Sequence, residues 1–170
     1  MLKINISFYK KCLYIFIYQI SLMKKDLYFV AVKVFLRNKD KHLLINKDVF
    51  GDWDIPGGRL RENDFNTPLE NVVTRKIKEE FGEIEYNLGK PVVFMRHERN
   101  EILANDDREK RKIFAIGYDA KYLSGKISLG KNHEKYEWVN LNNFKPEEYF
   151  TGGWLKGIND YIDMISKYDL

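Results

Sequence analysis

One amphipathic helix, set among strand-like segments, constrains the fold of this chain most. The helix is predicted over residues 68–81, where apolar residues recur at helical spacing. These residues are Leu69, Val72, Val73, Ile77 and Phe81. We expect Thr67 to be the N-cap, Pro68 the first helical residue and Glu70 the partner in a capping box. Gly82 is expected to end the helix.

Strand-like segments lie on both sides of this helix. An apolar, β-branched run over 27–36 predicts a strand buried on much of both faces, and the turn residues 38–41 predict a hairpin partner over 42–46. A short strand over 53–58 is expected to end in a tight, glycine-permitted bend. The other predicted elements are strands over 91–96, 112–119 and 135–139 and a closing amphipathic helix over 154–167. This order predicts a mixed α/β sandwich.

The composition excludes several classes of protein. Of the 170 residues, 44% are hydrophobic and 15% aromatic, which excludes intrinsic disorder and collagen-like chains. Three of the 29 lysines and arginines lie in residues 1–22, which carry no acid, so 26 basic residues face 25 acidic ones from Met23 onward. The chain from Met23 onward is therefore nearly neutral, which does not favour binding to DNA or RNA. The one cysteine, Cys12, excludes an intramolecular disulfide and fits a reducing compartment, so a cytoplasmic location is expected.

Residues 1–22 differ in composition from the rest of the chain. Their lysines precede an apolar run over 12–18, an arrangement that secretory signals share. The run lacks a small-x-small cleavage site and is too short to span a bilayer. We therefore expect 1–22 to be an N-terminal extension outside a folded domain of residues 23–170. A signal or membrane anchor is the alternative.

Charged residues interrupt the apolar face of the predicted helix. Glu80 and Lys76 project within the apolar arc, and Glu79 lies at its edge. Burying a carboxylate costs roughly a few kcal/mol unless it is paired or binds a cation. One interpretation is a Lys76–Glu80 ion pair, and the other is a hard divalent cation held by Glu79 and Glu80. Helix geometry alone leaves both open.

The Pro-Gly-Gly turn at 56–58 favours the metal interpretation. It precedes the helix closely and brings bare backbone near the helix flank, where a carbonyl oxygen could join the carboxylates. Ligand sets made only of oxygen select Mg²⁺ or Mn²⁺ over zinc. A tight turn without a ligand role is the alternative for these residues.

The turn and the helix together resemble the Nudix box. The family pattern is a glycine, five residues, a glutamate, seven residues, and then Arg-Glu-apolar-x-Glu-Glu-x-Gly. Gly58 and Asp64 match the first half, with aspartate in place of glutamate. The second half is matched by Arg75, Ile77, Glu79, Glu80 and Gly82. The segments 53–56 and 133–139 are also similar to the family, so the resemblance covers roughly residues 27–141.

Two departures from the family pattern bear on function. The spacer between Asp64 and Arg75 is ten residues long, so three residues are inserted around 65–68, before the helix. More seriously, Lys76 stands where the family has one of its metal-binding glutamates. Family members without that glutamate include enzymes that hydrolyse nucleotide sugars at the sugar carbon. Lys76 therefore leaves the usual metal set and mechanism open.

The resemblance implies a Nudix-type α/β/α sandwich with a mixed central sheet. It also implies hydrolysis of a nucleoside diphosphate linked to another moiety, at the pyrophosphate or at the sugar–phosphate bond, with Mg²⁺ or Mn²⁺ as cofactor. By matched position, Glu79, Glu80 and the Gly58 carbonyl would bind the metal. Arg75 would hold a box carboxylate, Asp64 or Glu79, in place for catalysis. Lys76 would neutralise a substrate phosphate or replace the charge of one metal ion.

The general base is expected from outside the box. The first candidates are His133 and Glu134, because the family often places a loop acid or histidine there and imidazole titrates near working pH. A second group of candidates for the general base consists of His97, Glu98 and Glu101, together with the charged loop 105–111. Trp53 is a substrate-binding candidate by stacking on a base, and Arg59, next to the glycines, is another.

Two other function classes stay open. A non-catalytic Nudix domain that binds a nucleotide as a sensor or interaction module is favoured by Lys76 and disfavoured by the intact Glu79–Glu80 pair. Decapping of RNA 5′ ends is disfavoured by the balanced charge and by the lack of an aromatic-basic stripe. The expected partner is therefore a small-molecule nucleotide derivative, with no nucleic acid and no membrane. A homodimer is left open.

Overall fold

The apolar strand predicted near the start of the chain is the centre of a mixed sheet. The computed structural model describes residues 26–102 and 108–168, so the predicted extension at 1–22 lies outside the described residues. The strands are β1 (Phe29–Arg37), β2 (His42–Asp48), β3 (Trp53–Asp54), β4 (Gly57–Arg59), β5 (Glu85–Ile102), β6 (Arg108–Ser124) and β7 (His133–Asn140). The helices are η1 (Glu62–Asp64), α2 (Leu69–Phe81), η2 (Pro146–Glu148) and α3 (Gly152–Tyr168). No helix within these described ranges is long and apolar enough to cross a membrane.

Both edges of β1 are occupied. Along one edge β1 pairs in parallel with β6, which pairs antiparallel with β5. Along the other edge β1 pairs antiparallel with β4 across Ala31–Lys33. Because β4 takes this edge, β2 meets β1 at the Arg37–Leu43 pair, next to the turn, and then lies antiparallel to β3 and β7. The predicted antiparallel hairpin between 27–36 and 42–46 is therefore confirmed, with its pairing confined to the end next to the turn.

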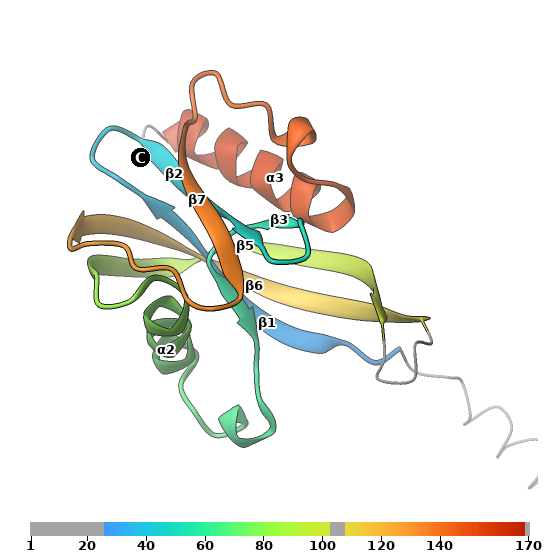
Figure 1. Cartoon of the computed structure of the whole chain (residues 1–170). Coiled ribbons are helices and arrows are strands. Elements are labelled where there is room, and N and C mark those ends of the chain that lie inside the picture. Colours follow the sequence, from blue (N-terminus) through green and yellow to red (C-terminus); the bar gives the residue numbers. More distant parts are fainter. Residues whose placement is uncertain (1–25, 103–107, 169–170) are drawn as a thin grey trace, which may run out of the picture.

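The two long helices cover opposite faces of the sheet (Figure 1). Alternate residues of β1 point to opposite faces, so each face has its own apolar core. The core against α2 includes Val32, Val34, Leu36, Val72, Val73, Ile77 and Phe81. The core against α3 includes Ala31, Phe35, Met95, Ile158, Tyr161 and Ile165. This arrangement confirms the predicted α/β/α sandwich with a mixed central sheet.

The start of α2 differs from the prediction. Pro68 is the N-cap in an extended conformation (φ −52°, ψ 136°), and no side-chain hydrogen bond caps the helix there. The Thr67 N–H donates to the Asp64 carbonyl at 2.9 Å, so Thr67 belongs to the turn after η1. Glu70 instead accepts a hydrogen bond from the Tyr118 hydroxyl at 3.4 Å. The predicted capping box of Thr67 and Glu70 is therefore wrong, because Pro68 is the N-cap and the Thr67 N–H, which Glu70 was expected to accept, is bonded to Asp64.

Candidate active site

The glycine turn that links β3 to β4 is tied to the last turn of α2. Gly57 has a φ of +128°, and a Cβ there would lie 2.1 Å from the Val32 carbonyl oxygen, so only glycine fits. The Gly57 N–H donates to Glu80 Oε2 at 2.9 Å. A Cβ at Gly58 would lie 3.2 Å from the ammonium nitrogen of Lys76. The turn thus fixes Glu80 and stands directly beside Lys76.

Glu79 is surrounded by cationic side chains. Its Oε1 accepts hydrogen bonds from Arg61 at 2.9 Å and from Arg75 at 3.1 Å. The ammonium of Lys76 lies 3.5 Å from Glu79 Oε2. Partial burial raises the pKa of Glu79, but the Arg75 hydrogen bond and the nearby positive charges outweigh burial and hold that pKa below its usual value. Arg75 also contacts Asp64 at 2.6 Å, so it touches both box carboxylates expected for it.

Glu80 lies in a different environment from Glu79. Burial raises the pKa of Glu80 to about 7, against the opposing effects of the Lys33 charge and the Gly57 hydrogen bond. The Lys76 ammonium contacts Glu79, and the part of the chain that the structure describes has no Lys76–Glu80 ion pair, so that one of the two interpretations is wrong. The two adjacent carboxylates therefore differ, because Glu79 is neutralised by cations and Glu80 is desolvated.

A cavity of about 450 Å³ opens at the end of α2, and we call it the helix pocket. Its lining consists of Arg61, Lys76, Glu79, Glu80 and residues 130–133. The loop before β7 closes the pocket because it binds the last carbonyl groups of the helix. The Gly130 N–H donates to the Glu80 carbonyl, and the Ser128 N–H donates to the Phe81 carbonyl, both at 2.9 Å. This loop brings His133 to the carboxylates of α2.

The structure separates the two candidates for the general base. His133 lines the helix pocket, and its buried Nδ1 has no hydrogen-bond partner among the described residues. Burial lowers the pKa of His133, so the ring is neutral at neutral pH. Glu134 points to the other face of β7, where its carboxylate lies 3.9 Å from the Lys47 ammonium. The structure thus brings His133, and not Glu134, together with Glu79 and Glu80.

A buried ion pair that the sequence analysis missed lies close to Glu80. Lys33, on β1, is 3% exposed, and its ammonium lies 2.6 Å from Asp54 Oδ2 and 3.2 Å from the Ile55 carbonyl oxygen. Its charge acts on the pKa of both Glu80 and His133. A single lysine within an otherwise apolar strand was the available signal for this residue.

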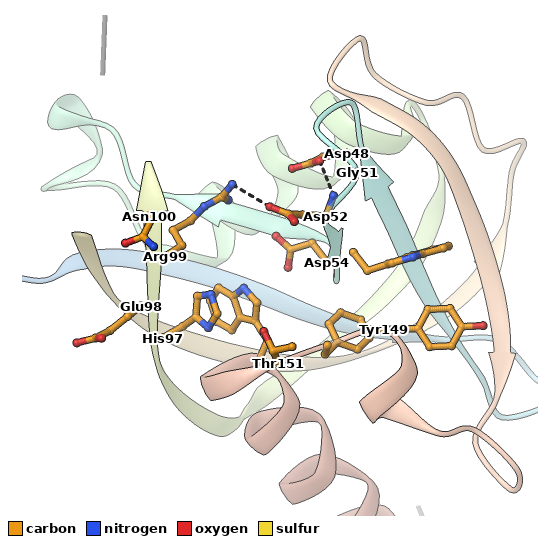
Figure 2. Close-up of a pocket in the computed structure, with 13 residues that line it drawn as sticks. Asp48, Gly51, Asp52, Asp54, His97, Glu98, Arg99, Asn100, Tyr149 and Thr151 are labelled. Atoms are coloured by element: carbon orange, nitrogen blue, oxygen red, sulfur yellow. Dashed lines mark hydrogen bonds and ion pairs between the residues drawn. The ribbon is translucent and has the colours of Figure 1, made fainter. Parts of the chain in front are cut away.

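A second cavity, of about 360 Å³, lies between β3, β5 and the start of α3, and we call it the sheet pocket (Figure 2). Its lining comes from residues 48, 51–54, 97–100, 149–151 and 154. The His97 ring stacks on Trp154 with 4.4 Å between ring centroids. Trp53, predicted to bind substrate, lies here, and its ring packs edge-on against Tyr149 at 5.1 Å. Arg59 lies outside both linings and pairs with Glu101 at 3.0 Å.

The carboxylates of the helix pocket suit one type of metal site. Within the described residues, no group of three or more carboxylate, imidazole or thiol side chains is placed to hold a metal ion. Mg²⁺ commonly binds through one or two protein carboxylates together with substrate phosphates. The Glu79–Glu80 pair fits a site of this kind, in which substrate phosphates complete the ligands of Mg²⁺, because both carboxylates line the same cavity. It does not fit a cage made of protein ligands alone.

Comparison with known proteins agrees with this fold. The model of the NUDIX domain matches residues 27–155. A comparison with curated proteins finds no match. The solved structure of the MutT protein from Methanosarcina mazei is 21% identical, with a TM-score of 0.62 over 85% of this chain and 97% of that chain.

Two further solved structures share the fold at lower identity. An ADP-ribose pyrophosphatase from Streptococcus suis is 13% identical, with a TM-score of 0.56 over 81% of this chain and 92% of that chain. A UDP-X diphosphatase is 9% identical, with a TM-score of 0.60 over 91% of this chain and 71% of that chain. NUDIX proteins are typically hydrolases and commonly depend on a divalent metal. Because the domain match spans most of its length, the chain belongs to the NUDIX family.

Proposed function

We propose that the chain hydrolyses a nucleoside diphosphate linked to another moiety, such as a nucleotide sugar or ADP-ribose. The observation that carries the proposal is the helix pocket, where two carboxylates of α2 stand among the cationic side chains of Arg61, Lys76 and Lys131. Cationic groups in such a cavity neutralise phosphate oxygens as charge develops on them. The names of the similar S. suis and UDP-X proteins describe the same class of substrate.

Mg²⁺ or Mn²⁺ is the proposed cofactor, and it would enter with the diphosphate. Glu80 and Glu79 would hold it, together with the Gly58 carbonyl that the resemblance to the family implies. When bound, the metal neutralises phosphate charge and polarises a water molecule. Glu80 is the better placed of the two, because Glu79 already faces three cationic side chains.

The remaining residues of the pocket have distinct proposed roles. Arg75 is a positioning residue, since it holds Asp64 and Glu79 by contacts of 2.6 and 3.1 Å. Lys76, largely shielded from solvent and next to Glu79, is placed to neutralise a substrate phosphate. His133 is the proposed general base, because its neutral ring has an unpartnered buried nitrogen that can accept a proton from water.

A nucleotide sensor is the second candidate function. It is favoured by the three cationic contacts of Glu79, which leave that carboxylate less available to a metal ion. It is disfavoured by Glu80, because a purely binding site gains nothing from a desolvated carboxylate.

A substrate screen tests the proposal directly. Nucleotide sugars, ADP-ribose and dinucleotides are incubated with Mg²⁺, and phosphate-containing products and free sugar are measured separately. We expect turnover of at least one class by the wild type and its loss in Glu80→Gln. Glu83→Gln, at an exposed glutamate just after the helix, is the matched control and should keep full turnover. Binding without turnover in every case would favour the sensor.

A further inference from the structure

The sheet pocket differs from the helix pocket in charge. Four carboxylate residues line it, namely Asp48, Asp52, Asp54 and Glu98. Among the described residues of this lining, Arg99 is the one arginine or lysine. A diphosphate would be repelled by so many carboxylates. The sheet pocket therefore suits the part of a substrate that carries hydrogen-bond donors and no phosphate.

Three of these carboxylates already have partners, and Glu98 pairs with the Lys110 ammonium at 3.0 Å. Asp54 pairs with Lys33 through one oxygen and accepts the Ile55 N–H through the other, at 2.8 Å. Asp48 Oδ1 accepts the N–H groups of Phe50 at 2.8 Å and of Asp52 at 3.0 Å, which holds the loop before β3. Asp48 and Asp54 therefore hold the fold, and Glu98 is engaged by Lys110, which leaves Asp52 as the carboxylate for a ligand.

Asp52 and Arg99 are the groups available to a ligand. The Asp52 side chain is 70% exposed, and its Oδ2 lies 3.4 Å from a terminal nitrogen of Arg99. Figure 2 shows the two side chains reaching towards each other from β5 and from the loop before β3. The Arg99 side chain is 35% exposed, and its Nε also lies 3.8 Å from Glu101 Oε1. Ion pairs of these lengths near the surface contribute little to stability, so a ligand can compete for Asp52 and for a terminal nitrogen of Arg99. The pair presents an acceptor and a donor side by side.

Aromatic side chains make the rest of the pocket suitable for a flat ring. Trp53, Tyr149 and Trp154 line it, and the stacked His97 places one more ring against Trp154. His97 Nδ1 is buried and has no hydrogen-bond partner among the described residues. Aromatic walls of this kind stack on any nucleobase, so specificity must come from the polar edge.

We propose that the sheet pocket binds a guanine base through Asp52 and Arg99. The ring N–H and the neighbouring amino group of guanine match the two oxygens of one carboxylate, and its carbonyl oxygen matches an arginine. Adenine presents an unprotonated ring nitrogen to Asp52, and uracil presents one N–H between two carbonyl oxygens. Cytosine offers a single amino group. The inference rests on the proposed function, since it assigns the nucleoside end of the same substrate.

Binding of nucleoside monophosphates without metal tests this assignment apart from catalysis. The quenching of tryptophan fluorescence reports binding, because Trp53 and Trp154 line the pocket. We expect GMP to bind at least about tenfold more tightly than AMP, CMP or UMP, with IMP, which lacks the amino group, in between. Equal affinity for AMP or UMP, or no binding of any of them at millimolar concentration, would overturn the inference.

Substitutions at the two polar residues sharpen the test. Asp52→Asn should weaken GMP binding about tenfold and leave AMP binding unchanged, and Arg99→Gln should weaken GMP binding independently. Asp40→Asn, at an exposed turn between β1 and β2 that is not part of the pocket lining, is the matched control and should bind GMP as the wild type does. Melting temperatures verify that each variant is folded. Full GMP selectivity in both Asp52→Asn and Arg99→Gln would refute the role of the pair.

The two proposals fail in different ways. If GMP binds selectively but no nucleoside diphosphate derivative is hydrolysed, the proposed function is wrong and the guanine assignment stands. If UDP-linked or ADP-linked substrates are hydrolysed and monophosphate binding shows no preference for guanine, the assignment is wrong and the proposed function stands.

Discussion

Replacing Glu80 with glutamine should stabilise the metal-free protein above neutral pH. Burial raises the pKa of Glu80 to about 7, against an ordinary value of 4.5. A carboxyl group with a raised pKa favours the folded state below pH 4.5, and this contribution is lost as the pH rises through 7. Glutamine has the shape of the protonated acid at every pH, and its amide oxygen can still accept the Gly57 N–H.

The size of the effect follows from the difference between the two pKa values. That difference, from 4.5 to about 7, corresponds to roughly 3 kcal/mol at about 1.4 kcal/mol for each pH unit. Glu80→Gln should therefore raise the free energy of unfolding by up to about 3 kcal/mol at pH 8 to 9. At pH 5 the gain should be about 1 kcal/mol or less, because the native carboxyl is then protonated.

Urea unfolding in the presence of a metal chelator measures this gain. Wild type, Glu80→Gln and the exposed control Glu83→Gln are compared at pH 5 and at pH 8. The control should show no pH-dependent gain. A Glu80→Gln protein that is no more stable than wild type at pH 8 would contradict this prediction. It would show that Lys33 and the Gly57 hydrogen bond fully compensate the cost of burying the Glu80 charge.

Three further predictions test other parts of the molecule. Deletion of residues 1–22 should leave the melting temperature and activity unchanged, whereas a large loss of stability would show that the segment packs on the domain. Lys33→Met should lower the free energy of unfolding by about 1–3 kcal/mol in urea, because it leaves Asp54, whose side chain is 28% exposed, without its ion-pair partner. Adding Asp54→Asn should recover part of that loss, and an additive loss would contradict the pairing. Because burial lowers the pKa of His133, the acid limb of kcat against pH should lie below pH 6.5 and disappear in His133→Gln.

The fold was predictable where local pattern decides it. The apolar spacing of α2 and α3 identified both helices, because each helix buries one face against the sheet. The hairpin of β1 and β2 was predicted from the turn between them, but the pairing of β2 with β3 and β7 was not, because β4 occupies most of that edge of β1. The N-cap was missed because Thr67 has a partner in the preceding turn, and a capping pattern does not reveal such a partner.

The candidate site also combines residues that local sequence placed together and residues that it did not. Arg75, Lys76 and Glu79 meet because they share one helix, and their spacing alone placed them together. His133 reaches the same pocket through a loop whose path no local pattern fixes, so the resemblance to the family supplied that prediction. The ion pair of Lys33 and Asp54 joins distant parts of the chain and was not predicted.

We propose that the helix pocket hydrolyses a diphosphate and that Lys76 takes part in the reaction. Lys76→Glu tests it, because the substitution removes the ammonium that lies 3.5 Å from Glu79 and adds a carboxylate in its place. Lys78→Glu, at an exposed lysine of the same helix, is the matched control for the change of charge.

The measurement is kcat and KM with Mg²⁺ over a panel of nucleotide sugars for wild type, Lys76→Glu and Lys78→Glu. We expect an active wild type, a raised KM or lowered kcat in Lys76→Glu, and little change in Lys78→Glu. A wild type that is inactive on every diphosphate tested, with a Lys76→Glu variant that gains activity, would exclude a catalytic role of Lys76 and favour the sensor.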